Sequence, residues 1–374
     1  MAGIYIHIPF CKRKCHYCNF FSLATTQYRP EFLEAILKEI VSRKAYLQGG
    51  IVDSIYLGGG TPSLLTNEEL RRIFDQLFVT FQISEQAEIT LEANPDDLSH
   101  SFLKELKNTA VNRLSIGIQS FDNEELKYVN RVHNSEDAMK SIKASQDAGF
   151  DNLSLDLIYG IPNSSLNSWE RNLRIIERTK ASHLSAYSLT QEPNTAYDIL
   201  VKKGKLQAPQ DEKTVAQYQM LQDFLPQLNM EQYEISNYAA DQKYALHNTN
   251  YWKGIPYLGL GPSAHSFNGK SRQWNISNLS KYMQSIKRGK VEAGQEILSL
   301  KDQWNEMIMT GIRTKWGVSI LDMESRFPKE WILKLEERAK EFIQNGHLVK
   351  MDGVYVLSPQ GKLYADGIAA EFFV

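Results

Sequence analysis

The sequence predicts an α/β fold: an open, partial, TIM-like barrel of about six strand–helix units, followed by a smaller, winged-helix-like α+β domain. Two observations predict it. Short apolar or β-branched runs alternate with longer amphipathic stretches through the first two-thirds of the chain, which is typical of parallel strands joined by crossover helices. From about residue 298 the pattern changes to three helical stretches followed by two short strands.

The barrel part rests on six expected strands. These are Ile4–Ile8, Ile51–Leu57, Glu88–Glu92, Arg113–Ile118, Asn152–Ile158 and His183–Leu189. Between them apolar residues recur with a helical period, as in the stretches 32–41, 67–81 and 135–148. Six units are too few for a closed eight-fold barrel, so we expect the barrel to stay open.

The last part of the chain begins with expected helices over Asp302–Arg313, Ser319–Phe327 and Glu330–Gln344, and Asp352-Gly353 is a hairpin signal. We therefore divide the chain into a barrel of residues 1–276, a linker of residues 277–297 and a C-terminal domain of residues 298–374. A winged helix can bind DNA, but Lys and Arg do not outnumber Asp and Glu from Ile297 onward. We interpret this domain as a packing or partner domain and expect no nucleic acid.

Composition narrows the protein class. The 374 residues are 42% hydrophobic and 23% charged, with a formal net charge of -2, which is typical of a globular protein and favours neither nucleic acid nor an anionic membrane. We expect no signal peptide and no membrane span. All three cysteines lie within residues 11–18, and an odd, tightly spaced set is no disulfide framework. This favours a cytoplasmic, reducing compartment with thiols free for a metal.

Cys11, Cys15 and Cys18 have the spacing CxxxCxxC. Thiolates select zinc or iron–sulfur clusters, and structural zinc usually takes two separated ligand pairs, of which the second is missing here. His16 or His7 could complete a Cys3His site, so zinc stays an alternative. Three thiolates on a [4Fe–4S] cluster would leave one iron for a small molecule, and the spacing favours this cluster.

Other motifs follow the ends of the expected strands, which meet at one rim of a parallel barrel. They are Gly58-Gly59-Gly60-Thr61-Pro62, Glu92 with Asn94, Gln119, Asp156 with Gly160, and Thr190. Taken singly, a glycine run is often only a turn, and an aspartate can belong to a buried network. Together they indicate one site: glycines allow close backbone approach, carboxylates and amides bond hydroxyls, and Arg131 can pair with a carboxylate.

The sequence resembles the radical S-adenosylmethionine (SAM) superfamily. The resemblance rests on the segment Tyr5–Cys11, the CxxxCxxC loop, the glycine run and the segments 117–121, 129–131 and 156–162. It extends over nearly the whole chain, to the branch that contains the oxygen-independent coproporphyrinogen III oxidases (HemN type) and the HemW-type haem chaperones. It implies a partial (β/α)6 barrel and a [4Fe–4S] cluster whose reduction cleaves SAM to a 5′-deoxyadenosyl radical.

Carried over by position, the resemblance assigns Cys11, Cys15 and Cys18 to the cluster. It also implies one or two SAM sites. Their residues would be Tyr5, Tyr17, Gly59, Gly60, Thr61, Glu92, Gln119, Arg131, Asp156 and Thr190, with His265 facing the same pocket. Tyr17 and Thr190 differ in residue type from the oxidase pattern.

Two departures separate the chain from the oxidase pattern. That pattern continues as CxxxCxxCxC, where this chain has Phe20, and it places an N-terminal arm before the first strand. The segment His247–Trp252 matches an HNxxYW motif of the chaperones. A neutral imidazole can ligate haem iron and aromatic rings can pack on a porphyrin, although a lone histidine in a polar loop usually ligates nothing. We expect this segment to be a loop across the barrel mouth, with His247 as haem ligand.

We therefore expect a haem chaperone that binds haem, a [4Fe–4S] cluster and SAM. Its partners would be a haem-acceptor protein, membrane-associated or not, and an electron donor for the cluster. The resemblance leaves enzymatic activity open and assigns no catalytic residue. The alternatives are an oxygen-independent coproporphyrinogen III oxidase and, more remotely, a non-catalytic zinc-binding protein.

Overall fold

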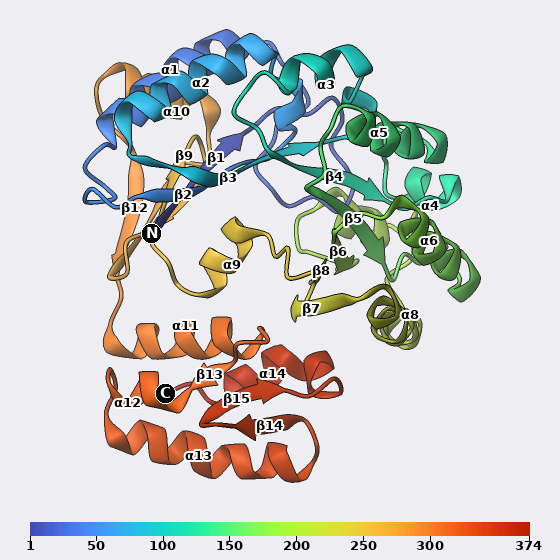
Figure 1. The fold of residues 1–374 in the computed structure, drawn as a ribbon, viewed down its shortest axis with the longest axis vertical. Coiled ribbons are helices and arrows are strands. Elements are labelled where there is room, and N and C mark those ends of the chain that lie inside the picture. The colour runs from blue at the N-terminus through green and yellow to red at the C-terminus, as the bar shows by residue number, and fades with distance from the viewer.

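Six parallel strands lie side by side in chain order, as the sequence predicts. The computed structural model describes all 374 residues (Figure 1). The six strands are β1 (Ala2–Ile8), β2 (Val52–Gly59), β3 (Ile83–Ala93), β4 (Arg113–Gln119), β5 (Leu153–Tyr159) and β6 (His183–Ser188). They form the centre of a curved sheet whose two edges do not meet, so the barrel is partial.

Helices cover the outer face of this sheet (Figure 1). They are α1 (Arg29–Ser42), α2 (Asn67–Thr80), α3 (His100–Leu106), α4 (Asn123–Tyr128), α5 (Ser135–Asp147), α6 (Leu166–Thr179) and α8 (Asp211–Phe224). Helix α7 (Ala196–Lys202) lies beside the cysteine loop, where the amide of Tyr197 donates to the carbonyl of His16 at 2.8 Å. Outward-facing strand residues such as Ile4, Ile6 and Leu114 join the helices in a core of 55 buried residues. Burial of this apolar area drives the packing of helices on the sheet.

The inward-facing positions of the strands are polar or aromatic. Side chains alternate in a strand, so Tyr5 and His7 of β1 face inward between the buried Ile4, Ile6 and Ile8. The inward positions of the next strands include Ser54, Tyr56, Glu92, Ser115, Asp156 and Tyr187. In a closed eight-fold barrel such positions are filled by branched apolar side chains. Here the interior, which we call the lumen, is built to hold polar groups.

The sheet is larger than the sequence predicts. Antiparallel β8 (Asn237–Ala240) and β7 (Met230–Glu234) extend it beyond β6. At the other edge β9 (Tyr257–Leu260) pairs parallel to β1, and antiparallel β10 (His265–Phe267), β11 (Ser271–Asn275) and β12 (Ala293–Ile297) follow. These strands have only three to five residues, too few for a clear alternating pattern.

The structure corrects the linker that we predict for residues 277–297. This segment forms helix α10 (Leu279–Lys287) and the edge strand β12. Leu279, Tyr282 and Ile286 are spaced at i, i+3 and i+7, and all three are buried in the core of the barrel. Their stripe is narrow and its neighbours are polar, so the average composition of the segment hid the helix.

The C-terminal domain has the winged-helix-like form that the sequence predicts. Its elements are α11 (Leu300–Ile312), β13 (Val318–Ser319), α12 (Ile320–Glu324), α13 (Lys329–Gln344), β14 (Leu348–Met351), β15 (Val354–Leu357) and α14 (Ala365–Glu371). Asp352 and Gly353 join β14 to β15 with positive φ angles of 50° and 78°. A separate core of 17 buried residues holds the domain together.

Helix α9 (Leu246–Trp252) lies between the sheet and the C-terminal domain (Figure 1). The C-terminal domain contacts the barrel nearby. The amide of Lys315 donates to the carbonyl of Tyr233 at 2.9 Å, and Thr314 forms an isolated antiparallel β-bridge with Glu234. None of the helices is both long and apolar enough to cross a membrane.

Candidate functional site

The cysteine loop follows β1 and is pinned to its neighbours at the C-terminal end of the barrel strands. The amide of Cys11 donates to the carbonyl of Leu23 at 2.9 Å, and the amide of His16 donates to the carbonyl of Val129 at 3.3 Å. Lys12 forms ion pairs with Asp96, at 2.8 Å, and Asp97, just after β3. These contacts fix the loop against the ends of β3 and α4.

The glycine run at the end of β2 lies directly against β1. Gly59 has a φ angle of 103°, and a Cβ atom on it would lie 2.5 Å from the His7 ring. His7 cannot move away easily, because its Nε2 donates to the carbonyl of Phe21 at 2.7 Å and its Nδ1 lies 3.1 Å from the Tyr5 hydroxyl. A Cβ on Gly60 would lie 2.6 Å from the Phe10 carbonyl. Only glycine fits at Gly59 and Gly60.

Arg131 joins the cysteine loop to β4. One guanidinium nitrogen, Nη2, donates to Asn94 Oδ1 at 2.6 Å and to the carbonyl of Gly117 at 2.7 Å. The other, Nη1, donates to Cys15 Sγ at 3.4 Å. The Nε–H is buried and has no partner. Although burial opposes its charge, nearby Tyr17 and Cys15 raise the pKa of Arg131, so it stays cationic. A positive group with a free donor beside a thiol suits an anionic ligand.

Two carboxyls face each other in the lumen. Glu92 accepts a hydrogen bond from the Tyr56 hydroxyl at 2.6 Å, and Asp156 accepts bonds from Ser115 at 3.1 and 3.2 Å. Burial raises the pKa of Glu92 to about 7, and the negative charge of Asp156 adds to this shift. Burial also raises the pKa of Asp156 to about 6, against the stabilising bonds from serine hydroxyls and the charge of Arg113. Both groups therefore titrate close to neutral pH.

The three thiols lie close together, and burial disfavours the charged forms of Cys11 and Cys18. Burial raises the pKa of Cys11 and raises that of Cys18 to about 11, and neighbouring thiols contribute to both shifts, so the three groups lie near one another. A cationic centre would stabilise the thiolates that burial disfavours. No group of three or more His, Cys, Asp or Glu side chains gathers around one ion position. Three cysteines could each bind a different iron of a four-iron cluster, as the spacing predicts.

The structure brings most of the predicted SAM residues to this end of the lumen. Tyr17 lies beside Cys15 and Arg131. Burial is the main cause of the raised pKa of Tyr17; the charge of Cys15 raises this pKa further, and the charge of Arg131 lowers it. Thr61 is buried and accepts a bond from Asn94 at 3.2 Å. Gln119 ends β4 with a φ angle of 68°, unusual for a residue with a side chain. Tyr5 lines the lumen below them, stacked on Tyr56.

Two of the predicted residues, Thr190 and His265, are exposed. Thr190 is exposed just after β6, where its hydroxyl donates to Glu192 at 3.3 Å. His265 lies on β10, where Phe267 pairs with the inward-facing Tyr257 of β9, so by alternation His265 is on the lumen face of the sheet. Its ring is exposed and stacks on Trp274 at 6.3 Å between ring centroids. Burial and the charge of Arg272 lower the pKa of His265, and the charge of Glu296 opposes this shift.

The segment with His247 is neither a loop nor at the barrel mouth. It forms α9 at the opposite end of the lumen, beside the beginnings of β1 and β2. The amide of His247 donates to Glu88 Oε1 at 3.1 Å, and its Nδ1 lies 3.0 Å from Ser54 Oγ. Its ring stacks on Tyr56 at 5.3 Å. Residues 54 and 247 are far apart in sequence, so no local pattern could show that this helix closes the base of the barrel.

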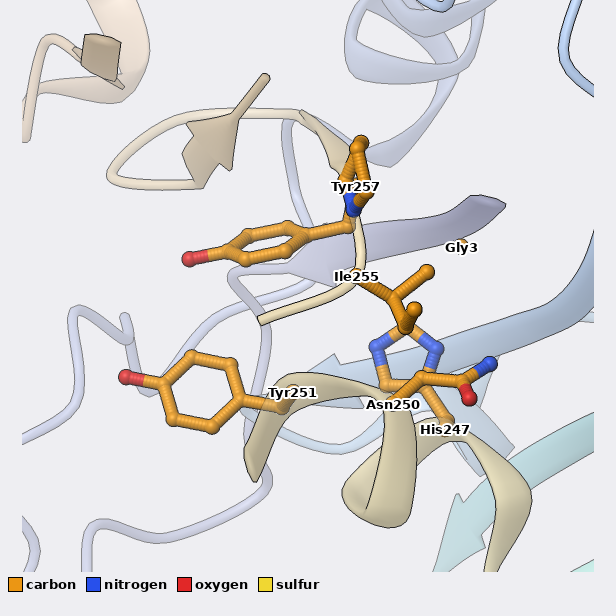
Figure 2. A pocket seen from close by; sticks show the side chains of 7 residues that line it. Gly3, His247, Asn250, Tyr251, Ile255 and Tyr257 are labelled. Atoms are coloured by element: carbon orange, nitrogen blue, oxygen red, sulfur yellow. The ribbon is translucent and has the colours of Figure 1, made fainter. Parts of the chain in front are cut away.

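A small cavity lies beside α9 (Figure 2). His247 and Ile255 lie on one side of it, and the rings of Tyr251 and Tyr257, 5.7 Å apart, lie on the other (Figure 2). Its empty space is about 180 Å³, open mouth included. That is below the roughly 300–1,000 Å³ of sites for drug-sized ligands, so a macrocycle does not fit it.

Two lumen residues, Tyr56 and Tyr187, escape the sequence analysis, and Asn94 is named there without its role. Asn94 orients Arg131, Tyr56 bonds Glu92, and Tyr187 near the end of β6 is 46% exposed to the lumen. Burial raises the pKa of Tyr187, and the charge of Asp156 contributes, which places the two residues together. Tyr56 and Tyr187 could have been found by alternation, because each stands two residues from another inward-facing position of its strand.

Comparison with known proteins agrees with this geometry. Residues 5–176 match the family model of the Radical SAM superfamily, and residues 298–364 match that of the HemN C-terminal domain. The solved structure of coproporphyrinogen III oxidase (HemN) from Escherichia coli aligns with a TM-score of 0.87, over 100% of this chain and 90% of that chain. Its sequence is 23% identical, so the likeness shows the fold.

Curated relatives are closer in sequence. A protein of Bacillus subtilis named Heme chaperone HemW is 33% identical over 100% of this chain and 99% of its own length. Proteins with the same name from Lactococcus lactis and Mycobacterium tuberculosis are 32% and 30% identical, over 86% and 98% of this chain and 84% and 93% of their own lengths. The chain therefore belongs to the HemW family of the radical SAM superfamily.

Proposed function

We propose that this protein is a haem chaperone of the radical SAM type, which binds haem and passes it to an acceptor protein. The observation that carries the proposal is the convergence at one rim of three thiols, a glycine run, a free guanidinium donor and two carboxyls. Full-length relatives named haem chaperones support the haem part. The acceptor protein, membrane-associated or not, and an electron donor for the cluster complete the proposal.

Each group of rim residues would bind a different part of the two cofactors. Cys11, Cys15 and Cys18 would hold the [4Fe–4S] cluster, which supplies an electron for SAM cleavage when bound. Gly59 and Gly60 leave room for the amino-acid part of SAM. Arg131 would pair with its carboxylate through the unpartnered Nε–H and Nη1. Glu92 and Asp156 would accept bonds from hydroxyls of the ribose.

The same residues argue against the two alternatives. The oxidase pattern has a fourth cysteine where this chain has Phe20, and the Phe20 side chain is 60% exposed, so no cysteine-like ligand stands there. The likeness to the oxidase structure concerns the fold, and a fold can host more than one function. A Cys3His zinc site would need His7 or His16, and both rings already bond elsewhere, His7 to Tyr5 and Phe21 and His16 to the carbonyl of Tyr128.

His247 remains the candidate haem ligand, but from inside the lumen. Burial lowers its pKa to about 4, so the ring is neutral at pH 7. In the tautomer whose Nδ1–H donates to Ser54 Oγ, the Nε2 lone pair is free for a metal. The cavity beside α9 is too small for haem, so haem would enter through the open lumen or α9 would move aside.

We expect wild-type protein to bind haem saturably with a Soret band, and His247→Ala to shift that band or weaken binding about tenfold or more, since one axial bond is lost. The titration is read by absorbance with the iron–sulfur content measured in parallel. His100→Ala is the matched control, because His100 is exposed at the start of α3, on the outer face of the sheet. An unchanged His247→Ala spectrum and affinity would remove His247 as ligand, and no saturable binding by the wild type would end the chaperone proposal.

SAM binding is expected to depend on pH. Glu92 and Asp156, with pKa values of about 7 and 6, accept hydroxyl bonds best as carboxylates. SAM affinity should therefore fall by about tenfold or more as the pH drops from 8 to 5.5, because the free protein takes up protons that SAM must displace. Isothermal titration across this range measures it. Asp156→Asn should leave a weaker, flatter profile with one step below pH 7, because the charge of Asp156 no longer raises the pKa of Glu92. An equal affinity at all pH values would contradict this role for the carboxyls.

A further inference from the structure

A chain of buried hydrogen bonds runs through the base of the barrel toward Asp156. At its lower end, the indole N–H of Trp252 donates to Asn248 Oδ1 at 3.1 Å. The Asn248 amide nitrogen in turn donates to the Tyr233 hydroxyl oxygen at 3.2 Å. Both residues belong to α9, and Tyr233 belongs to β7. The chain therefore starts on the helix that closes the lumen.

The upper half continues across two parallel strands. The Tyr233 hydroxyl lies 2.9 Å from His183 Nε2 on β6, and His183 Nδ1 lies 2.7 Å from Ser154 Oγ on β5. Ser154 Oγ donates to Asp156 Oδ1 at 3.4 Å. Tyr233 and Ser154 are 0% exposed and His183 is 1% exposed. Water cannot take over a bond that is lost in such a buried chain.

The donors all point the same way. Because the Tyr233 oxygen accepts from Asn248, its own proton is free to bond His183 Nε2. That bond fixes the proton of neutral His183 on Nδ1, from where it bonds Ser154. The Ser154 hydroxyl proton then points to Asp156 directly or to Ser185 Oγ at 3.3 Å, whose own hydroxyl also bonds Asp156, so both routes end on that carboxylate. Burial, together with the charge of Arg113, lowers the pKa of His183 well below its usual value, which keeps the ring neutral as this order requires.

We propose that Tyr233 and His183 are positioning residues for SAM, which hold the Asp156 carboxylate in place through a one-directional hydrogen-bond chain anchored on Asn248 and Trp252. The inference rests on the proposed SAM site. Two residues of the HNxxYW segment, Asn248 and Trp252, would thus help to hold Asp156 at the SAM site.

The lower end of the chain also touches the C-terminal domain. The carbonyl of Tyr233 accepts from the Lys315 amide at 2.9 Å, and the Tyr233 ring contacts Trp316 with 6.1 Å between centroids. The Arg313 guanidinium lies 5.5 Å from the centre of the Trp252 ring. The lower end of the chain is thus held between the barrel and the C-terminal domain.

Tyr233→Phe tests the chain, since it removes one hydroxyl and keeps the ring. We expect SAM to bind about fivefold more weakly to reconstituted protein, the effect of one lost hydrogen bond. We also expect the midpoint of its pH dependence to move to higher pH, because a carboxylate that loses support binds protons more readily. Asp156 is also faced by Arg113, Glu92, Tyr56 and Tyr187, which this substitution does not touch.

Tyr244→Phe is the matched control. Its ring lies 4.9 Å from that of Tyr233, but its hydroxyl bonds Glu231 and Lys315 outside the chain. It should leave SAM affinity and its pH midpoint unchanged. Circular dichroism and thermal unfolding of both variants check that they fold alike.

A double-mutant cycle decides whether the effect passes through Asp156. In an Asp156→Asn background, Tyr233→Phe should have no further effect on SAM binding, whereas an additive effect would mean that Tyr233 acts by another route. If Tyr233→Phe equals the wild type while Asp156→Asn weakens binding, the chain is wrong and the SAM site stands. If the wild type binds no SAM, the proposed function itself fails.

Discussion

Cys15→Ser is expected to abolish the iron–sulfur centre and, with it, SAM binding. The wild type, reconstituted anaerobically, should hold about four irons per chain, and the variant less than about a tenth of that. Cys15 is the thiol that Arg131 contacts, at 3.4 Å, so its loss removes a cluster ligand and also frees the guanidinium. Iron and sulfide assays, the absorption spectrum and SAM titration measure the effect.

Phe20→Ala is the control for Cys15→Ser. Phe20 lies in the same loop and is 60% exposed, so its loss should leave the iron content unchanged. Stoichiometric zinc without iron uptake in the wild type would contradict the cluster and revive the zinc alternative. Normal iron content in Cys15→Ser would mean that another residue supplies the third ligand.

Gly59→Ala is the second substitution with a large expected effect. Alanine at a φ of 103° is strained, and its Cβ would lie 2.5 Å from a His7 ring that Phe21 and Tyr5 hold in place. Strain and overpacking together are expected to cost about 2–4 kcal/mol of stability. Because His7 also anchors the end of the cysteine loop at Phe21, SAM affinity should fall about 30-fold or more, or about 2 kcal/mol.

Gly49→Ala is the control that separates the effect of backbone strain from the effect of the contact with His7. Gly49 also has a positive φ, of 77°, but nothing lies within 4 Å of the Cβ position. It should lose only about 1 kcal/mol of stability and keep full SAM binding. Urea unfolding and SAM titration of the two variants provide the comparison. Equal losses in both would show that the His7 contact has no effect and that Gly59 acts through its backbone angle alone.

The barrel could be predicted because its information is local. Each of β1 to β6 carries an apolar face that alternates with polar positions, and each helix carries an apolar stripe. Once parallel strands are accepted, their C-terminal ends must meet, so Glu92, Arg131 and Asp156 could be placed at one rim although they lie far apart in sequence. The structure brings these three together, as Arg131 with Asn94 and Glu92 with Asp156 show.

What the sequence did not reveal depends on distant contacts. His247 follows the sixth strand, and only its bonds to Ser54 and Glu88 place it at the base of the lumen. The polar composition of residues 277–297 conceals the three buried side chains of α10. In each case the deciding partner is an element that local periodicity cannot identify.

The most direct test of the proposed function compares two activities of one anaerobically reconstituted wild-type sample. Haem is titrated into one half, and coproporphyrinogen III, SAM and a reductant are added to the other. The proposal predicts saturable haem binding with a Soret band, and no protoporphyrinogen IX. Robust formation of protoporphyrinogen IX without saturable haem binding would contradict the chaperone and make the oxidase the correct assignment.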